Sequence, residues 1–148
     1  MGSEMCIRDS LIFVPLGGSN EIGMNMNLYH FSGKWIIVDL GISFGDDTMP
    51  GVDVLVPDPS FIEAQRENLL GIVVTHGHED HIGAIPYLWE RLGCPIFSTP
   101  FTASLIRRKL VEKGIVEKVK LVEINSSSSW YVPDIITGSP PARYTSMT

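Results

Sequence analysis

The chain has 148 residues, of which 44% are hydrophobic and 19% are charged. This length and composition predict one soluble, globular domain of modest size. The net charge of −6 argues weakly against nucleic acid as a partner, because binding to phosphates usually depends on lysine and arginine. A local basic patch could still bind it. No apolar run approaches the roughly 20 residues that span a bilayer, so no membrane association is expected.

The first ten residues, MGSEMCIRDS, show no hydrophobic periodicity and lack the apolar core of a signal peptide. We interpret residues 1–10 as a non-native or disordered extension. The two cysteines, Cys6 and Cys94, lie far apart, which excludes a disulfide framework and a cysteine-type zinc site. A reduced, cytoplasmic setting is therefore expected.

Three apolar segments open the domain that we place at residues 11–124. LIFVPL has the pattern of a buried strand, MNMNLYHF alternates apolar and polar side chains, and WIIVDLG is again apolar, which together predict a β-meander. The intervening GGSNEIG suggests a phosphate loop, but it lacks the G-x-x-x-x-G-K-[ST] spacing and no helical pattern follows it. A tight glycine turn between strands is the better interpretation.

The stretch from residue 41 to residue 61 is rich in glycine, proline and aspartate, which predicts a long loop with short extended pieces. Its aspartates suggest a calcium loop, but they lack the spacing of an EF-hand. A short helix is expected next, over 61–69, with Ser60 as its N-cap and Glu63 completing a capping box.

Strands and helices then alternate up to residue 124. Ile82, Ile85, Trp89 and Leu92 recur at the spacing of one helical face, and Gly93 gives that helix its end. The expected elements are a strand over 69–76, a helix over 82–93, a strand over 94–100, a helix over 102–114 and a strand over 116–124. Residues 125–148, with a serine run and several prolines, are left unassigned as a disordered or foreign tail.

The segment VVTHGHEDHIG, residues 73–83, carries the chemistry. His76 and His78 are two positions apart, so in an extended segment both imidazoles point to one side and can meet one ion. Asp80 and His81 follow where the chain turns into a helix, and they can face a second ion. Imidazole and carboxylate are ligands that zinc accepts when no thiolate is offered.

Two such ions would hold a water made acidic enough to act as a nucleophile near neutral pH. Asp80 could also orient this water or accept its proton, which makes it the candidate catalytic residue. A chance cluster on a surface loop is the alternative, but three histidines and an aspartate at this spacing argue against it. Glu79 is expected to be a solvated side chain pointing away from the ions.

The pattern H-x-H-x-D-H after a strand resembles the signature of the metallo-β-lactamase fold, an αββα sandwich of the α/β (α+β) class. The flanking segments PLGGSNEIGMNM, VDLGISFGDDTMPGVDVLVPD and GIVVTHGHEDHIGAIPYLWERLGCPIFSTPFTASLI resemble the N-terminal part of the ribonuclease J family. The resemblance covers residues 11–124 and fades in the tail.

This resemblance implies a zinc-dependent RNA hydrolase with 5′-to-3′ exonuclease and endonuclease activity in the bacterial cytoplasm. It also implies two zinc ions, RNA bound against an inserted β-CASP domain, and a homodimer. His76 and His78 match ligands of one zinc, and Asp80 and His81 match ligands of the other. Asp39 matches a buried acid that supports the metal site, although an aspartate capping a turn at a strand end is a close alternative.

The sequence departs from the family by lacking a third histidine on the first zinc, a bridging aspartate and a further histidine on the second. His30, the remaining histidine, precedes the motif and is expected at a surface or strand end. The sandwich is therefore expected to be incomplete and the chain inactive alone. Two alternatives stay open, a hydrolase of small esters or thioesters like glyoxalase II, and a non-catalytic fragment.

One basic cluster, Arg107 to Lys109 with Lys113, Lys118 and Lys120, remains to be assigned. It could contact the RNA backbone. A solvated helix face is the preferred interpretation, because Glu112, Glu117 and Glu123 interleave its cations.

Overall fold

The structure is a computed structural model that describes residues 10–125. The predicted extension at residues 1–10 and the unassigned tail at 125–148 lie outside the described residues, apart from Ser10 and Asn125. Within residues 10–125, no helix combines the length and the apolar character needed to cross a lipid bilayer.

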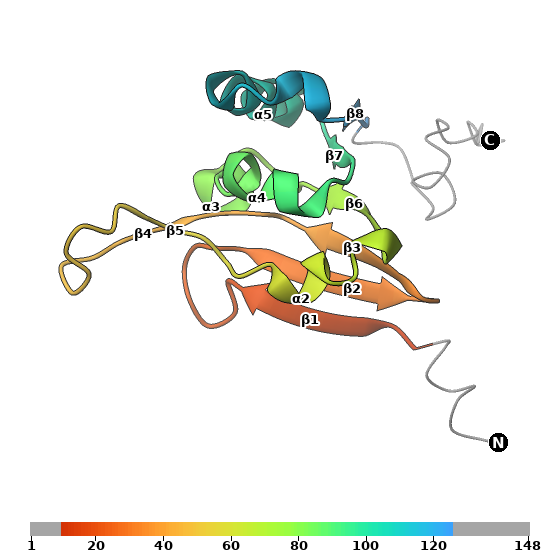
Figure 1. Ribbon diagram of the computed structural model, residues 1–148, viewed down its shortest axis with the longest axis horizontal. Helices are drawn as coiled ribbons and strands as arrows, with labels where there is room; N and C mark the ends of the chain where they lie inside the picture. Colours follow the sequence, from red (N-terminus) through yellow and green to blue (C-terminus); the bar gives the residue numbers. More distant parts are fainter. Residues whose placement is uncertain (1–9, 126–148) are drawn as a thin grey trace, which may run out of the picture.

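The domain opens with the predicted β-meander (Figure 1). Strands β1 (Ile12–Gly17), β2 (Met26–Phe31) and β3 (Lys34–Val38) pair antiparallel in that order. A two-residue turn joins β2 to β3, and both of its residues have positive φ, 49° at Ser32 and 79° at Gly33. Such a turn matches the twist of the strands it connects.

The sheet then continues in parallel. Strand β6 (Leu69–Val73) lies beside β3, and β7 (Ile96–Ser98) and β8 (Leu121–Glu123) extend the sheet to six strands in the order β1-β2-β3-β6-β7-β8. Parallel neighbours need crossover connections, which here contain helices. The helices are α2 (Ser60–Glu63), α3 (Glu79–Ile82), α4 (Ile85–Leu92) and α5 (Pro100–Lys113), with single 3₁₀ turns at Arg66–Asn68 and Val116–Lys118.

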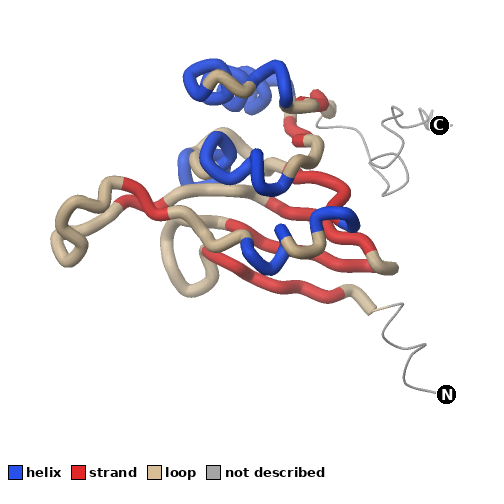
Figure 2. The backbone as a smooth tube through the Cα atoms, viewed as in Figure 1, coloured by secondary structure: helices blue, strands red, loops and turns tan. Residues whose placement is uncertain are grey.

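A long excursion separates β3 from α2, as predicted for residues 41–61. It contains the short antiparallel pair β4 (Ser43–Phe44) and β5 (Val54–Leu55), which forms an arm beside the main sheet (Figure 2). The protein is thus of the predicted mixed α/β class. Within residues 10–125 it holds one large sheet with its helices, and the second large sheet of an αββα sandwich is not among these residues.

The core lies on one face of the large sheet. Leu28, Ile37, Ile72 and Ile96 are aligned across β2, β3, β6 and β7, and each is fully buried in a cluster with the apolar sides of the helices. The opposite face is more open, since Phe13 on β1 is 50% exposed. The buried face fixes the register of the strands, because a slip of one residue would turn these side chains outward.

Two helical predictions need correction. Ser60 is not the N-cap of α2, since Pro59 occupies that position and makes no side-chain cap. The N–H of Ser60 instead donates to Asp58 Oδ1 at 3.0 Å, and the Glu63 carboxylate accepts from Arg91 Nε at 3.0 Å. The capping box is therefore replaced by an aspartate turn and an ion pair, and the Arg91 guanidinium lowers the pKa of Glu63.

The predicted helix over 82–93 is two helices, α3 and α4, with a break at Gly83 and Ala84. The four apolar positions of its predicted face are all buried, and Gly93 ends α4 with φ of 62°, as expected. The strand predicted over 116–124 is shorter, because its first three residues form a 3₁₀ turn and β8 begins at Leu121.

The buried Cys94 offers a chemical test of the core. Its burial raises the pKa of the thiol to about 12, from 9.0. In a Cys6→Ser variant, which removes the only other cysteine, we expect no reaction with a thiol reagent at pH 8 until the chain unfolds. Rapid reaction of the folded chain would contradict this burial.

The same shift links stability to alkaline pH. Because the folded pKa lies above the unfolded one, the folded chain holds the proton longer. The contribution of Cys94 is therefore complete below pH 9 and is lost as pH rises toward 12. Between pH 8 and pH 10, urea unfolding should show a larger decline in the free energy of unfolding for the unmodified chain than for a Cys94→Ala variant.

Candidate metal centre

The candidate site forms where β3 and β6 end. These strands are parallel neighbours, so their carboxyl ends meet at one edge of the sheet, and Asp39 N–H donates to the Val73 carbonyl at 2.9 Å across them. Asp39 directly follows β3, and His76 and His78 follow β6. The chain turns at His78 into α3, which carries Asp80 and His81. The motif after β6 and Asp39 at the end of β3 thus converge, although Asp39 lies 36 residues before Thr75.

Asp39 is the buried anchor of the site, with 4% exposure. Its Oδ1 accepts from the Thr75 backbone N–H at 2.8 Å, and its Oδ2 lies 2.8 Å from His81 Nδ1. A carboxylate can only accept here, so Nδ1 of His81 carries a proton, and in the neutral ring this leaves the lone pair on Nε2. The structure therefore places Asp39 where both sequence interpretations meet, at a turn after a strand and against a predicted metal ligand.

The four predicted ligands lie together as two pairs. His76 Nε2 is 3.1 Å from His78 Nδ1, and Asp80 Oδ2 is 3.2 Å from His81 Nε2. The pairs adjoin, since the ring centres of His76 and His81 are 4.0 Å apart. Two donors on one tetrahedral zinc, each bonded at about 2.0–2.2 Å, lie roughly 3.3 Å apart, so both separations suit a shared ion.

These pairs are not closed sites. Within residues 10–125, no three His, Cys, Asp or Glu side chains are arranged to hold a metal ion. His30 does not contribute, because it packs on Trp35, at the beginning of β3 and therefore at the other end of that strand from Asp39. Imidazole and carboxylate donors fit zinc, and each pair would offer an ion two protein donors.

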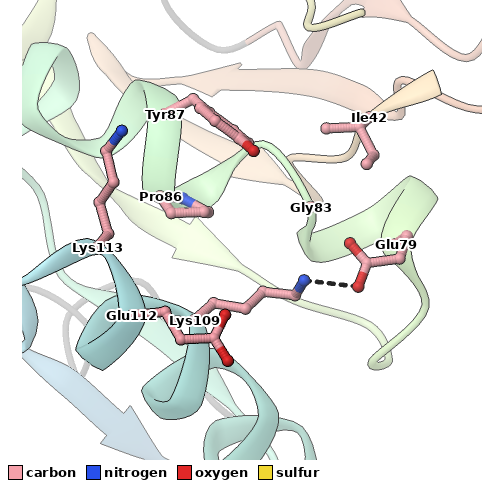
Figure 3. A pocket seen from close by; sticks show the side chains of 8 residues that line it. All are labelled: Ile42, Glu79, Gly83, Pro86, Tyr87, Lys109, Glu112 and Lys113. Carbon is pink, nitrogen blue, oxygen red and sulfur yellow. Dashed lines mark hydrogen bonds and ion pairs between the residues drawn. The ribbon is translucent and has the colours of Figure 1, made fainter. Parts of the chain in front are cut away.

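Glu79 points away from the histidines and toward α5. Its carboxylate pairs with Lys109 Nζ at 2.5 Å, in a cavity of about 260 Å³ that Tyr87 and Lys113 also line (Figure 3). The pair is partly exposed, so its contribution to stability is small. This placement agrees with the expectation that Glu79 is not a ligand.

Three further cations of the basic cluster are paired with acids as well. Three pairs at the surface are Arg107–Glu123, Arg108–Glu112 and Lys118–Glu90, at 3.2, 3.3 and 3.1 Å. Paired cations have less charge to offer to phosphates, which agrees with a solvated helix face rather than an RNA contact.

A second cavity, of about 480 Å³, adjoins the histidine pair. It lies between the motif and the beginning of α5, where Phe101 is 74% exposed. Its lining residues are Thr75, His76, Gly77, His78, Thr99, Phe101, Thr102 and Leu105. The histidines therefore face a space large enough for part of a substrate.

Sequence reasoning missed Asn25, which contacts the motif from the connection between β1 and β2. Its Nδ2 donates to the Asp80 carbonyl at 3.0 Å and lies 3.4 Å from His81 Nε2. The one signal in the sequence that could have indicated this contact was the length of the connection, because residues 18–25 are more than an antiparallel hairpin needs. The glycines of this connection were interpreted only as a turn.

Comparisons with known proteins place this arrangement in a family. The model of the metallo-beta-lactamase superfamily matches residues 24–140. Ribonuclease J of Sinorhizobium meliloti is 44% identical over 110 residues, which cover 72% of this chain and 20% of that protein. Ribonuclease J 2 of Staphylococcus aureus (strain MRSA252) is 36% identical over 115 residues, covering 78% of this chain and 21% of that protein.

Among solved structures, a diphosphatase from the PhnP family matches with a TM-score of 0.43 and 21% identity, over 74% of this chain and 40% of that one. The chain spans about a fifth of the length of the two ribonucleases. The family match covers well over half of the chain and includes the whole H-x-H-x-D-H motif at the end of β6. The chain therefore belongs to the metallo-beta-lactamase superfamily, whose fold implies bound metal ions.

Proposed function

We propose that this chain is part of a zinc-dependent RNA hydrolase similar to ribonuclease J, in which an activated water attacks a phosphodiester. The observation that carries the proposal is the pair of two-donor sets, His76 with His78 and Asp80 with His81, at separations of 3.1 and 3.2 Å. The 44% identity to the ribonuclease J of Sinorhizobium meliloti supports RNA as the substrate class.

When bound, zinc would supply a water ionisable near neutral pH and a positive charge beside the phosphate. His76 and His78 would hold one ion, and Asp80 and His81 the other. Asp80, whose Oδ2 is 3.2 Å from His81 Nε2, would also orient the water or take its proton. Asp39 would support the centre by fixing the ring and the proton of His81.

The cavity beside the histidine pair supports a nucleic-acid substrate. Its rim carries the exposed ring of Phe101, and aromatic faces stack on bases without regard to sequence. We propose both 5′-to-3′ exonuclease and endonuclease activity in the bacterial cytoplasm for a longer, dimeric protein. The 148-residue chain alone should be inactive, because two protein donors for each ion leave the ions loosely held.

Zinc content tests the metal centre directly. The purified chain, dialysed to equilibrium against buffer with a fixed concentration of free zinc, should hold zinc in excess of the buffer by elemental analysis, and a His76→Ala/His78→Ala variant should lose at least half of that excess. A His30→Phe variant serves as the control, since His30 lies away from the motif, and it should keep the zinc of the unmodified chain.

Equal zinc in the chain and the double variant, or none in either, would contradict a metal centre preformed in this chain. The substrate class is tested separately with a protein that carries this segment together with the remainder of a ribonuclease J. Cleavage of 5′-monophosphorylated RNA is expected, and hydrolysis of a thioester instead would favour a glyoxalase II-like enzyme.

A further inference from the structure

The connection between β1 and β2 contacts the motif at Asn25. Its backbone N–H and its Nδ2 both donate to the Asp80 carbonyl, at 3.1 and 3.0 Å. Two donors on one carbonyl fix the peptide that joins Asp80 to His81. Asn25 is half-buried and is 55 residues from Asp80 in the chain, so this contact is a tertiary one.

The same Nδ2 also faces the atoms that would bind metal. It lies 3.4 Å from Asp80 Oδ2 and 3.4 Å from His81 Nε2. An amide nitrogen carries two N–H groups, and the Asp80 carbonyl takes one of them. The second N–H is left on the side of the carboxylate oxygen and the imidazole nitrogen, so the carboxamide borders the point at which these two atoms converge.

Gly18 explains why the Asn25 carboxamide keeps this position. A Cβ atom on residue 18 would lie 2.3 Å from Asn25 Oδ1 and 2.9 Å from its Cγ. The backbone of Gly18, with φ of 84°, is tied into the connection by a hydrogen bond from its N–H to Glu21 Oε1 at 2.9 Å. The glycine-rich connection therefore forms the wall behind the carboxamide.

We propose that Asn25 is a positioning residue of the metal centre, whose carboxamide, backed by Gly18, holds Asp80 and His81 aimed at a common ion. This inference rests on the proposed function only in assigning a metal to that pair. It gives the connection between β1 and β2 a role that a simple glycine turn would not have.

The first test replaces the carboxamide by an apolar group of the same shape. An Asn25→Leu variant should bind Co²⁺ about tenfold or more weakly than the unmodified chain, and the visible absorption bands of bound Co²⁺ should change in position or intensity. Asn27→Leu is the matched control, since Asn27 is also half-buried but lies on β2 opposite Val38 and makes none of the hydrogen bonds of Asn25 to Asp80.

The second test moves the carboxamide without changing it. Gly18→Ala should weaken Co²⁺ binding as Asn25→Leu does. Gly33→Ala is its control, because Gly33 has a similar φ of 79° but nothing within 4 Å of its added Cβ. Both variants suffer the same backbone strain, so a loss confined to Gly18→Ala isolates the displacement of Asn25.

Metal-free nuclear magnetic resonance keeps this inference separate from the proposed function. If the unmodified chain binds no Co²⁺, the proposed metal centre fails in this chain. The inference is then judged on the imidazole nitrogen shifts of His81 and the amide shift of Asp80. A change in Asn25→Leu and Gly18→Ala, absent in both controls, supports it. Unchanged shifts, or unchanged Co²⁺ affinity and absorption where Co²⁺ binds, would overturn it.

Discussion

An Asp39→Asn variant is expected to bind zinc roughly 10- to 100-fold more weakly than the unmodified chain, with its fold intact. The Thr75 N–H, which donates to Oδ1, keeps the oxygen of the new amide on that side. The amide nitrogen then replaces Oδ2, 2.8 Å from the protonated Nδ1 of His81. Two donors would face each other, and the pair can only relax if His81 moves its proton to Nε2.

That change of tautomer removes the ligand atom. Nε2 is the nitrogen that lies 3.2 Å from Asp80 Oδ2, and once protonated it has no lone pair for a metal. Affinity should be measured by competition with a chelating dye. Asp46→Asn is the matched control. Like Asp39, Asp46 accepts a hydrogen bond from a threonine, in this case Thr48, but it is exposed and outside the motif.

An Asp39→Ala variant separates the effect on the tautomer of His81 from the effect on the free energy of unfolding. It leaves the Thr75 N–H and the His81 Nδ1–H without their acceptor in a buried place, which costs about 2 kcal/mol of the free energy of unfolding. Asp39→Asn should cost less, because its shape and one acceptor remain. If Asp39→Asn bound zinc as the unmodified chain does, Asp39 would be a turn cap and nothing more.

The sequence was sufficient where the deciding contacts are local. The meander, the later strands and the amphipathic α4 follow from short apolar runs and from periods of two and 3.6 residues, which any segment carries within itself. The four candidate ligands were found for the same reason, since His76 and His81 are only five positions apart. From the sequence, only a common direction of these side chains could be anticipated. The separations of 3.1 and 3.2 Å within the two pairs could not.

The sequence was insufficient where the structure depends on contacts with backbone that is distant in the chain. The helix predicted over 82–93 breaks where Ala84 N–H donates to the carbonyl of Leu40, on a distant segment, in place of a helical carbonyl. The Asn25 contact to Asp80 spans 55 residues and has no pattern of its own. The capping box at Ser60 failed more simply, since Asp58 competes for the same backbone donor.

The segment after Asp39 shows how tightly this distant backbone is packed against the motif. Leu40 N–H donates to the His81 carbonyl at 2.8 Å, and Ile42 N–H donates to the Glu79 carbonyl at 3.1 Å. Gly41 lies between them and passes directly over the Asp80 peptide. A Cβ atom there would be 1.6 Å from the Asp80 carbonyl oxygen and 2.6 Å from the His81 nitrogen.

A Gly41→Ala variant is therefore expected to lose about 3 kcal/mol or more of its free energy of unfolding and to bind zinc more weakly than the unmodified chain. The atoms that would collide are backbone atoms held by hydrogen bonds, so no side chain can rotate away to relieve the contact. Gly51→Ala is the control, because its φ of 82° is strained for alanine but its Cβ meets nothing within 4 Å. It should cost only about 1 kcal/mol. Urea unfolding measures both, and a Gly41→Ala chain as stable as Gly51→Ala would mean that residues 40–42 do not hold the motif in place.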